Sequence, residues 1–287
     1  MVKTRPLRES DREDILDIAR NTWDGHDYLP HYFDEWLKDL TCHPMAIEEN
    51  SRVAALANLK IIDDGMTGWM EGLRVHPDYR GRGYASSITD LLVTMAKDLG
   101  VKRVRYTTAI DNYESLHLAD KIGMKRIFRM GVFWEPNLDK MEINVDIENL
   151  SQLDIEQECN SVISSGLIPN NVIVIDWKAF DVSPYIFSMF EEVEIWSHVV
   201  EEHLQSLSVG ALRYDMHDTV WAFTIYTNHA NLFLQQMSKQ IELAKKKKLD
   251  RIMMIFPYDF YSELNKFEWM QDEEYPDFGL FLLEKKL

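Results

Sequence analysis

The spacing of apolar residues along the first half of the chain predicts alternating strands and helices. Between residues 84 and 99, apolar side chains recur every three or four positions, from Ile88 to Leu99, which places them on one face of a helix. Gly100 then provides a typical helix end. In residues 101–110, Val104 and Tyr106 begin an alternation of side chains that is typical of a strand.

The same reasoning assigns the rest of this half. Ser10, with Glu13 three residues later, has the capping-box pattern of a helix start. Asp63-Asp64-Gly65 favours a hairpin turn. Strands are expected at residues 3–7, 45–48, 53–62, 68–75, 101–110 and 124–134, and helices at 10–22, 32–40, 84–99 and 112–122. The expected order is β-α-α-β-β-β-α-β-α-β.

A similar order of elements recurs in the second half, which indicates a weak internal repeat. Strands are expected at residues 142–146, 193–200, 207–214, 220–226 and 251–256, and helices at 151–164 and 231–248. Residues 172–190 give no clear pattern. With a boundary near residues 136–140, we expect domains at 1–138 and 139–287. The fold class is α+β (α/β), and each domain is a mixed, mostly antiparallel sheet flanked by helices.

Composition and charge restrict the kind of protein. The chain has 287 residues, 46% of them hydrophobic, which is enough for two cores. Its net charge is -17, of which residues 141–287 carry -14. Acidic surfaces repel nucleic acid, so we expect no nucleic-acid partner. Neither a signal peptide nor a long apolar run is visible, so we expect no membrane partner and a cytoplasmic protein.

The two cysteines support the same interpretation. Cys42 and Cys159 are too far apart in sequence to suggest a disulfide framework or a zinc-ligand spacing. We therefore expect a reducing environment and no metal. The oligomeric state stays open.

A short stretch rich in glycine and arginine, Tyr79 to Ala85, lies between the expected strand 68–75 and the expected helix 84–99. Gly81 and Gly83 allow positive φ angles and the close approach of a ligand to the backbone. The start of a helix adds unpaired N–H groups and the positive end of the helix dipole. Such a junction is typical of a phosphate-binding site, and a tight, solvated turn is the structural alternative.

Two familiar phosphate loops fit this stretch poorly. The sequence lacks the G-x-x-x-x-G-K-[ST] pattern of nucleotide-binding P-loops. It half-matches the dinucleotide motif from Gly81 to Ser86, but Pro77 and Tyr79 separate it from the strand. The preceding strands also read as an antiparallel meander, not a β-α-β unit.

The stretch resembles the acetyl-CoA signature of the GNAT N-acyltransferase superfamily, whose core is R/Q-x-x-G-x-G/A. The matching pattern here is E-x-L-x-V-x-P-x-x-R-G-x-G-x-A, from Glu71 to Ala85, followed by N-x-x-S-x-x-L from Asn112 to Leu118. The resemblance covers the whole first half. The second half resembles a degenerate copy of the same fold, because the strand 220–226 continues through TNHANLF without Gly or Arg. The resemblance therefore implies two tandem GNAT-like domains with one active site, in residues 1–138.

The resemblance implies acetyl-CoA as cosubstrate and assigns the residues that bind it. The strand before the loop is expected to part from the strand 101–110 and to leave a V-shaped gap for the pantetheine arm. The backbone N–H of Val75 would polarise the acetyl carbonyl. The expected cofactor-binding residues are Leu73, Val75, Arg80, Gly81, Arg82, Gly83, Tyr84, Ala85, Asn112 and Ser115.

The sequence suggests a general base but no general acid. Glu71 lies four residues before Val75, and we expect it to remove the proton of the attacking ammonium group. The superfamily often uses a tyrosine of the later helix as general acid, but Ala119 stands at that position. Tyr113 or His117 could replace it, or a thiol leaving group needs no acid. The general acid stays open.

The acceptor amine is expected near the loop between the first two helices. Asp24, His26, Asp27 and Tyr28 gather there around Gly25 and suit a cationic amine or an amino-acid head group. A capped helix-helix turn is the structural alternative. The stretches DGHDYLP and EGLRVHPDYRGRG resemble the tandem branch of the superfamily, which has histidine N-acetyltransferase-like members.

The sequence thus predicts an acetyl-CoA-dependent N-acetyltransferase that transfers acetyl directly to a primary amine of a small molecule or amino acid. Two alternatives stay open. One is an acetyltransferase for the N-termini or lysines of proteins and peptides. The other is a CoA-binding regulatory module without turnover, for which the absent helix tyrosine is the supporting feature.

Overall fold

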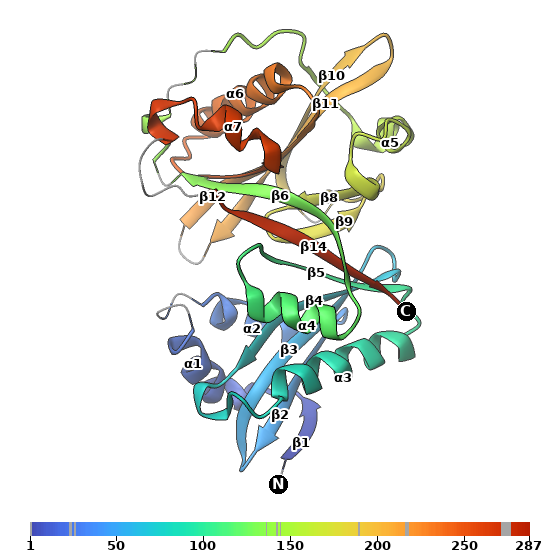
Figure 1. Cartoon of the computed structure of the whole chain (residues 1–287), viewed down its shortest axis with the longest axis vertical. Helices are drawn as coiled ribbons and strands as arrows, with labels where there is room; N and C mark the ends of the chain where they lie inside the picture. The colour runs from blue at the N-terminus through green and yellow to red at the C-terminus, as the bar shows by residue number, and fades with distance from the viewer. Residues whose placement is uncertain are drawn as a thin grey trace. The chain divides into compact units, whose positions relative to one another are not determined.

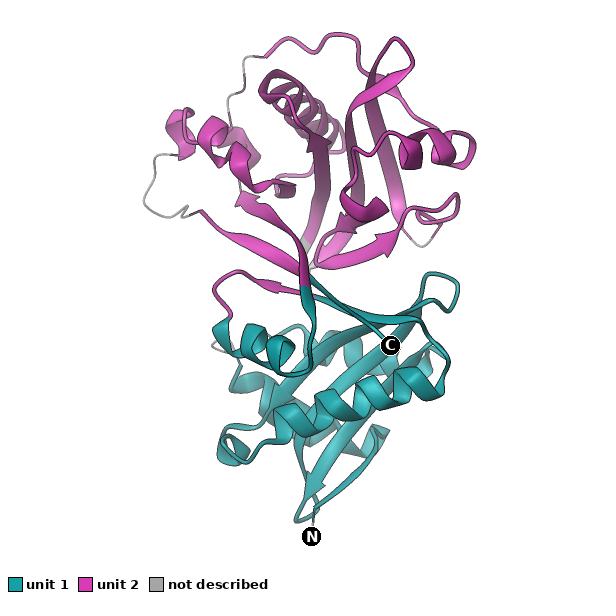
Figure 2. Cartoon of the chain, turned by 45° about the vertical axis from the view of Figure 1, so that its right-hand side comes forward, with its two compact units in different colours: residues 1–106, 113–125, 283–287 teal, residues 107–112, 126–282 magenta. Residues whose placement is uncertain are grey.

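The computed structural model describes residues 2–22, 25, 27–135, 137–141, 143, 145–188, 190–215, 218–270 and 277–287. The chain forms two compact units, shown in teal and magenta in Figure 2. Unit 1 consists of residues 1–106, 113–125 and 283–287, and unit 2 of residues 107–112 and 126–282. The chain passes from one unit to the other within three of its strands, and the units are described separately below.

Unit 1 is a sheet with helices on both faces (Figure 1). Its strands are β1 (Val2–Pro6), β2 (Cys42–Glu49), β3 (Arg52–Ile62), β4 (Thr67–Val75) and the first part of β5 (Arg103–Ala109). Its helices are α1 (Arg12–Arg20), α2 (Leu29–Lys38), α3 (Tyr84–Asp98) and α4 (Tyr113–Lys121). Strands β1 to β4 are antiparallel neighbours in chain order, as a meander requires.

The two faces of this sheet bury different helices. Leu56 belongs to an apolar cluster with Ile18 of α1 and Phe33 of α2. Leu59 is three positions further along β3 and therefore points to the opposite face. There it packs beside Gly68, next to Ala96 of α3. Amphipathic helices cover both faces, so β3 is apolar on both sides and reads as a nearly continuous hydrophobic run.

Strand β4 contains a bulge at Gly72. Between the pairs Leu56↔Arg74 and Asn58↔Glu71, β4 advances by one residue more than β3 does. Gly72 has φ +67°, and a Cβ there would overlap the indole of Trp36. Bulges of this kind use glycine at positive φ and increase the local bend of the strand. The close packing of Trp36 of α2 on the glycine holds the bend in place.

Strand β4 parts from β5 near this bulge. The two strands pair in parallel only at Thr67↔Arg103, Gly68↔Val104 and Trp69↔Arg105. Beyond Trp69, β4 continues for six residues with β3 as its registered partner. The resemblance stated above implies such a parting, and it leaves the far edge of β4 without a strand partner there.

The end of the chain completes unit 1. Strand β14 (Gly279–Lys286) lies next to β5 in the strand order, and its last residues belong to unit 1. Arg105 Nε donates to Glu284 Oε2 at 2.8 Å, and Asp63 Oδ2 lies 3.6 Å from Arg105 Nη1. All three side chains are nearly buried. A buried ion network thus ties the C-terminal strand to β5.

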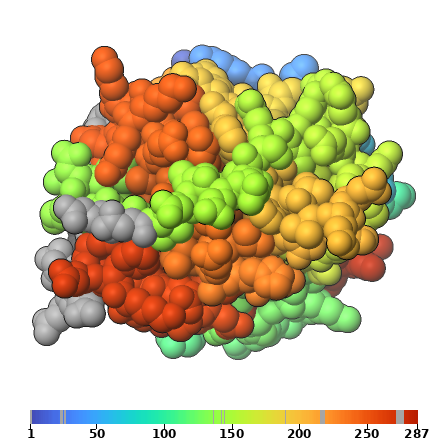
Figure 3. Space-filling view, turned by 90° about the horizontal axis from the view of Figure 1, so that it is seen from above, coloured from blue at the N-terminus to red at the C-terminus, as the bar shows by residue number. Residues whose placement is uncertain are grey.

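Unit 2 is also built on paired strands of mixed direction, and β8 and β9 pair separately from the others. After β6 (Lys125–Glu135) its elements are β7 (Ser151–Gln152), α5 (Ile155–Ser164), β8 (Val172–Ile175), β9 (Lys178–Asp181), β10 (Glu191–Val200), β11 (His203–Asp215), β12 (Asp218–Thr227), α6 (Ala230–Lys246), β13 (Ile252–Pro257) and α7 (Tyr261–Leu264). The strand order is β14-β6-β13-β12-β11-β10-β7, and β12 and β13 are parallel. Phe233 of α6 packs with Phe223 and Phe256 in the core. Figure 3 shows a face of unit 2 where side chains of α6 and of β10–β11 reach the surface.

Most expected elements agree with the structure, and three expectations are wrong. The described residues of 142–146 (143, 145 and 146) form no strand. Helix α5 begins four residues later than expected, because Ser151 and Gln152 form β7. The capping box of Ser10 and Glu13 is replaced by Asp11, whose Oδ2 accepts from the N–H of Arg8.

The expected domains, 1–138 and 139–287, are continuous in sequence, whereas the two units are not. The proposed division into an active and a degenerate domain stays a prediction. No helix in the described part of the chain combines the length and the apolar character needed to cross a lipid bilayer.

The bulge gives a testable prediction for stability. Gly72→Ala forces a Cβ into Trp36 at a positive φ, and we expect a loss of about 3 kcal/mol in the free energy of unfolding. Gly65→Ala is the matched control, since Gly65 also has positive φ but has no atom within 4 Å of the added Cβ. It should cost about 1 kcal/mol. Equal losses in urea denaturation would contradict the proposed packing role of Trp36.

Candidate functional site

The loop between β4 and α3 has an open backbone. A short 3-10 turn, Pro77–Tyr79, follows β4, and Gly83 precedes the first residue of α3. Gly81 and Gly83 have φ angles of +75° and +79°, and no atom lies within 4 Å of a Cβ placed on either. Glycine is therefore required here by backbone conformation and not by crowding. The open space above both residues lets a ligand approach the main chain.

The loop presents a row of unpaired amides. Arg80 N–H donates to Pro77 O at 3.2 Å, and Ser87 N–H donates to Gly83 O at 3.0 Å. Among the described residues, none accepts a hydrogen bond from the backbone N–H groups of residues 81–86. These groups include the first three of α3, at the positive end of a 15-residue helix. The arrangement is suited to an anion.

Arg82 holds the loop to the sheet. Its Nη1 donates to Glu49 Oε2 at 2.8 Å, and its Nη2 donates to Asp78 O at 3.1 Å. Tyr84 Oη donates to the same Glu49 oxygen at 2.9 Å. The guanidinium also lies over the ring of Tyr79. Arg82 was expected to bind the cofactor, but its charge is already matched by Glu49 at the end of β2.

The remaining cations of the loop are Arg80 and a residue of α4. Arg80 is exposed, and no described carboxylate pairs with it. Lys121 Nζ donates to Ser86 Oγ at 3.0 Å, in the first turn of α3. Lys121 is exposed and likewise has no carboxylate partner among the described residues.

The N–H of Val75, at the end of β4, points away from β3. His76 N–H donates to Ala54 O at 2.9 Å. The N–H of Val75, one residue earlier, therefore points to the other edge of β4. On that edge the pairing with β5 ends at Trp69. The N–H of Val75, which is expected to polarise the acetyl carbonyl, is thus directed to the side where the strands have parted.

Leu73, another expected cofactor-binding residue of β4, is half-buried, and its carbonyl accepts from Arg74 Nη1 at 2.9 Å.

Glu71 lies on β4 beside the bulge. Its carboxylate is half-buried and accepts from Asn58 Nδ2 at 2.9 Å. Asn58 is completely buried, and its own Oδ1 has no hydrogen-bond partner among the described residues. An amide fixed in the sheet therefore orients the Glu71 carboxylate. This orientation suits a group that must remove a proton at a fixed place.

Asp27 has a different environment from the expected one. Its carboxylate is fully buried and accepts two bonds from Arg74, at 2.8 Å from Nε and 2.9 Å from Nη2. It also accepts from the N–H of Leu29, at the start of α2. Asp27 is thus engaged in a buried ion pair, so its carboxylate already has a cationic partner. Asp24 and His26 lie outside the described residues.

Tyr28 packs on this ion pair. The guanidinium of Arg74 lies 5.1 Å from the centre of the Tyr28 ring, whose edge also meets Tyr32. Burial raises the pKa of the Tyr28 hydroxyl, and the positive charge of Arg74 offsets part of this effect. The negative charges of Glu71 and Asp27 raise that pKa further.

Helix α4 holds the remaining expected residues. Asn112 is exposed and belongs to unit 2, directly before α4. Ser115 Oγ donates to Tyr106 Oη at 3.3 Å, while Tyr106 Oη donates to Ser115 O at 3.0 Å. Tyr113 is 77% exposed and Ala119 only 1%. The position at which the superfamily carries its tyrosine is thus a small buried residue.

Four residues that the sequence analysis did not single out shape this site. Gly72 could have been recognised, because an isolated glycine within a strand pattern indicates a bulge. Asn58 also carried a signal, as the one amide in the apolar run VAALANLKII. Arg74 and Lys121 have no local signal, because each is defined by a partner that is distant in sequence.

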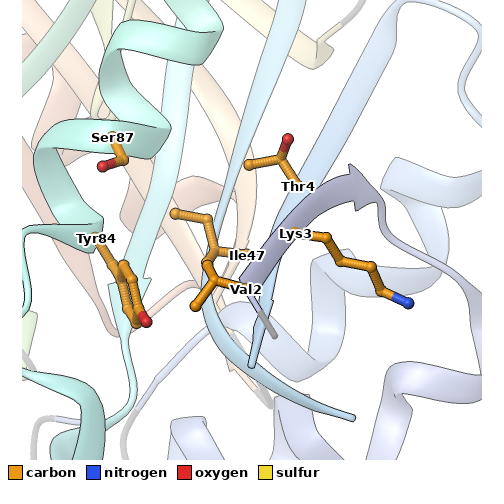
Figure 4. A pocket seen from close by; sticks show the side chains of 6 residues that line it. All are labelled: Val2, Lys3, Thr4, Ile47, Tyr84 and Ser87. Carbon is orange, nitrogen blue, oxygen red and sulfur yellow. The ribbon is translucent and has the colours of Figure 1, made fainter. Parts of the chain in front are cut away.

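Outside this loop and strand, the other candidates for a site are a cavity, the corresponding junction of unit 2 and a metal-binding cluster. A shallow cavity of about 530 Å³ adjoins Tyr84 and Ser87 on the side of β1 (Figure 4). In unit 2, β12 ends at Thr227 and α6 begins at Ala230, so only Asn228 and His229 stand where unit 1 has its loop. The described residues contain no cluster of three or more His, Cys, Asp or Glu that could hold a metal ion.

Part of the chain matches a known protein family. Residues 12–124 match the acetyltransferase (GNAT) family. These residues are therefore similar to GNAT acetyltransferases, and the resemblance drawn from the loop sequence is confirmed. The matched segment runs from α1 to the end of α4 and includes β2 to β5 and the loop.

The alignment with curated relatives is longer than the segment that matches the family. A histidine N-acetyltransferase from Oreochromis niloticus is 27% identical over 207 residues, which are 65% of this chain and 61% of that protein. The matched part thus spans about three fifths of the length of such relatives.

Solved structures match the whole chain. A GCN5-related N-acetyltransferase from Sphaerobacter thermophilus has a TM-score of 0.62 at 12% identity and covers 99% of this chain and 95% of that one. A tandem GNAT protein from the clavulanic acid biosynthesis pathway has a TM-score of 0.56 at 11% identity and covers 100% and 98%. At these identities the likeness shows the fold alone, and it confirms the expected fold class of mixed sheets flanked by helices.

The buried pair of Asp27 and Arg74 predicts a large effect on stability. Asp27→Ala leaves a buried guanidinium without its carboxylate, and we expect a loss of about 3 kcal/mol in the free energy of unfolding. Asp34→Ala is the matched control, because Asp34 pairs with Arg12 at a half-exposed position in α2. It should cost at most about 1 kcal/mol. Chemical denaturation of both variants tests this, and a small loss for Asp27→Ala would contradict a structural ion pair.

Proposed function

We propose that this chain is an acetyl-CoA-dependent N-acetyltransferase, which transfers acetyl directly from the thioester to a primary amine of a small molecule or amino acid. The observation that carries the proposal is the loop of residues 80–86, in which unpaired amides, two glycines at positive φ and the start of α3 occur together. The GNAT family match over residues 12–124 supports the same cosubstrate.

The loop fits the pyrophosphate of CoA. Its six consecutive N–H groups, 81–86, have no described acceptor and can donate to phosphate oxygens. The absence of side-chain bulk above Gly81 and Gly83 permits the close approach that such bonds need. Arg80 adds a positive charge that no described carboxylate neutralises. A bound pyrophosphate would satisfy groups that unit 1 otherwise leaves without partners.

The edge of β4 supports the role assigned to Val75. Its N–H points away from β3, towards the side where β5 no longer pairs. A fixed backbone donor of this kind stabilises negative charge that develops on an acyl oxygen during attack by an amine. The donor is held in place by the strand, so no rearrangement is required during the reaction.

Glu71 is the proposed general base. An amine attacks a thioester only after it has lost its proton, and a positioned carboxylate can accept that proton directly or through water. The buried amide of Asn58 orients the Glu71 carboxylate, and the bulge at Gly72 sets its place on the strand. The thiol of CoA is a fair leaving group, which is consistent with the absence of a tyrosine at position 119.

A free amino acid or related amine is the proposed acceptor class. The curated relatives are named histidine N-acetyltransferase, which favours a small acceptor. On this side of the sheet Tyr28 offers an aromatic wall, and Glu71 a negative charge near it. We also propose a cytoplasmic setting, because both Cys42 and Cys159 are free thiols.

A second candidate is a CoA-binding module without turnover. The buried Ala119, at the position of the common family tyrosine, is the observation that favours it. Release of the CoA thiol in the presence of a panel of amino acids, polyamines and peptides separates the candidates. Tight CoA binding without thiol release for any amine would support the second one. Inhibition by peptides and not by free amino acids would indicate a protein acceptor.

Glu71→Gln tests the general base. Glutamine keeps the acceptor for Asn58 Nδ2 but cannot take up a proton, so we expect kcat/KM to fall by about 100-fold at neutral pH. The defect should shrink as the pH rises towards the pKa of the amine, because more of the amine is then already neutral. The control is Glu13→Gln, an exposed residue of α1. A defect that is constant over the whole pH range would contradict the role of base.

A further inference from the structure

We infer that Lys121 of α4 is a phosphate-binding residue of the CoA site, and that Arg82 is a positioning residue that shapes the loop. This inference rests on the proposed function and assigns the cations of that site. It begins from the hydrogen bond of Lys121 Nζ to Ser86 Oγ, at 3.0 Å. Lys121 lies outside the glycine-arginine loop in sequence, 35 residues after Ser86.

The place of the ammonium group is electrostatically unfavourable without an anion. Ser86 is the third residue of α3, and its own N–H is one of the unpaired amides. Lys121 therefore brings a positive charge to the positive end of a helix, where acidic side chains are normally stabilising. Arg80 adds a second unmatched charge to the same loop. An anion bound to the amides would turn this repulsion into attraction.

The end of its own helix does not account for the position of Lys121. A lysine in the last turn of a helix often binds the free carbonyl groups there. At the end of α4 a lysine of β14 has that role: Lys285 Nζ donates to the carbonyl of Ile122 at 2.5 Å. Lys121 Nζ instead reaches α3, and no described carboxylate pairs with it.

Arg82 differs from Lys121 because its charge is paired with a carboxylate. Its guanidinium binds Glu49 Oε2 and Asp78 O and lies over the ring of Tyr79. Glu49 also accepts from Tyr84, so Glu49 links the end of β2 to residues on either side of Gly83. The charge of Arg82 is balanced, and its contacts fix the loop conformation that presents the amides.

Titration calorimetry with CoA tests the assignment. Loss of one charge-assisted hydrogen bond to a phosphate should weaken the binding of CoA to Lys121→Ala by about fivefold to tenfold. The dependence of Kd on salt concentration should also become less steep, because one fewer charge is involved. Lys121→Arg should restore most of the affinity.

Two control variants separate charge from structure. Ser86→Ala removes the tether of Lys121 but keeps its charge, so CoA affinity should change by less than about twofold. Lys97→Ala removes an exposed charge at the other end of α3, about 20 Å away, and should have no effect. If Ser86→Ala weakens binding as much as Lys121→Ala does, the lysine only joins two helices and the inference is wrong.

Dephospho-CoA identifies which phosphate is bound. If the penalty of Lys121→Ala disappears with this ligand, the lysine binds the 3′-phosphate, and if the penalty persists, it binds the pyrophosphate. Equal CoA affinity of Lys121→Ala and Lys97→Ala would overturn the inference while leaving the proposed function intact. Failure of the unaltered protein to bind CoA would instead overturn the proposed function itself.

Discussion

The proposed chemistry of unit 1 depends on the parting of β4 from β5. The two strands pair for only three residues, up to Trp69, and the bulge at Gly72 then bends β4. Because of this parting, the N–H of Val75 keeps no strand partner on its outer edge. The bulge also sets the position of Glu71, while the indole of Trp36 prevents the strand from straightening. A continuous sheet would bury the same backbone groups in ladder hydrogen bonds and leave nothing for a thioester to contact.

In the loop after β4, one group of residues fixes the backbone conformation and another carries the unmatched positive charge. Glycines at positive φ and the start of α3 supply donors, and Arg82 with Glu49 fixes their arrangement. Arg80 and Lys121 then carry the unmatched positive charge. Unit 2 has a comparable parallel pair, β12 and β13, connected by the long helix α6, but the junction between β12 and α6 contains no glycine. The same supersecondary frame without the loop chemistry is consistent with one CoA site in the chain.

The sequence predicted the parts of this arrangement that depend on local pattern. Periodicity found α1 to α4 and β1 to β6 to within a few residues, and the glycine-arginine loop indicated the resemblance to the GNAT family. Contacts between distant residues were beyond such reasoning. Asp27 was expected to suit a cationic amine, and its ion pair with Arg74 could not be foreseen because Arg74 is 47 residues away. Strand β14 was not expected, and its ion pair from Glu284 to Arg105 spans 179 residues. Local sequence also could not show that Arg82 is neutralised by Glu49.

A crystal structure with bound CoA tests the central claim most directly. The account predicts pyrophosphate oxygens within hydrogen-bond distance of the amides of residues 81–86, and the thiol end of the pantetheine arm beside the N–H of Val75. It also predicts no CoA at the start of α6. Phosphates bound away from residues 81–86, or a CoA molecule at α6, would contradict the account.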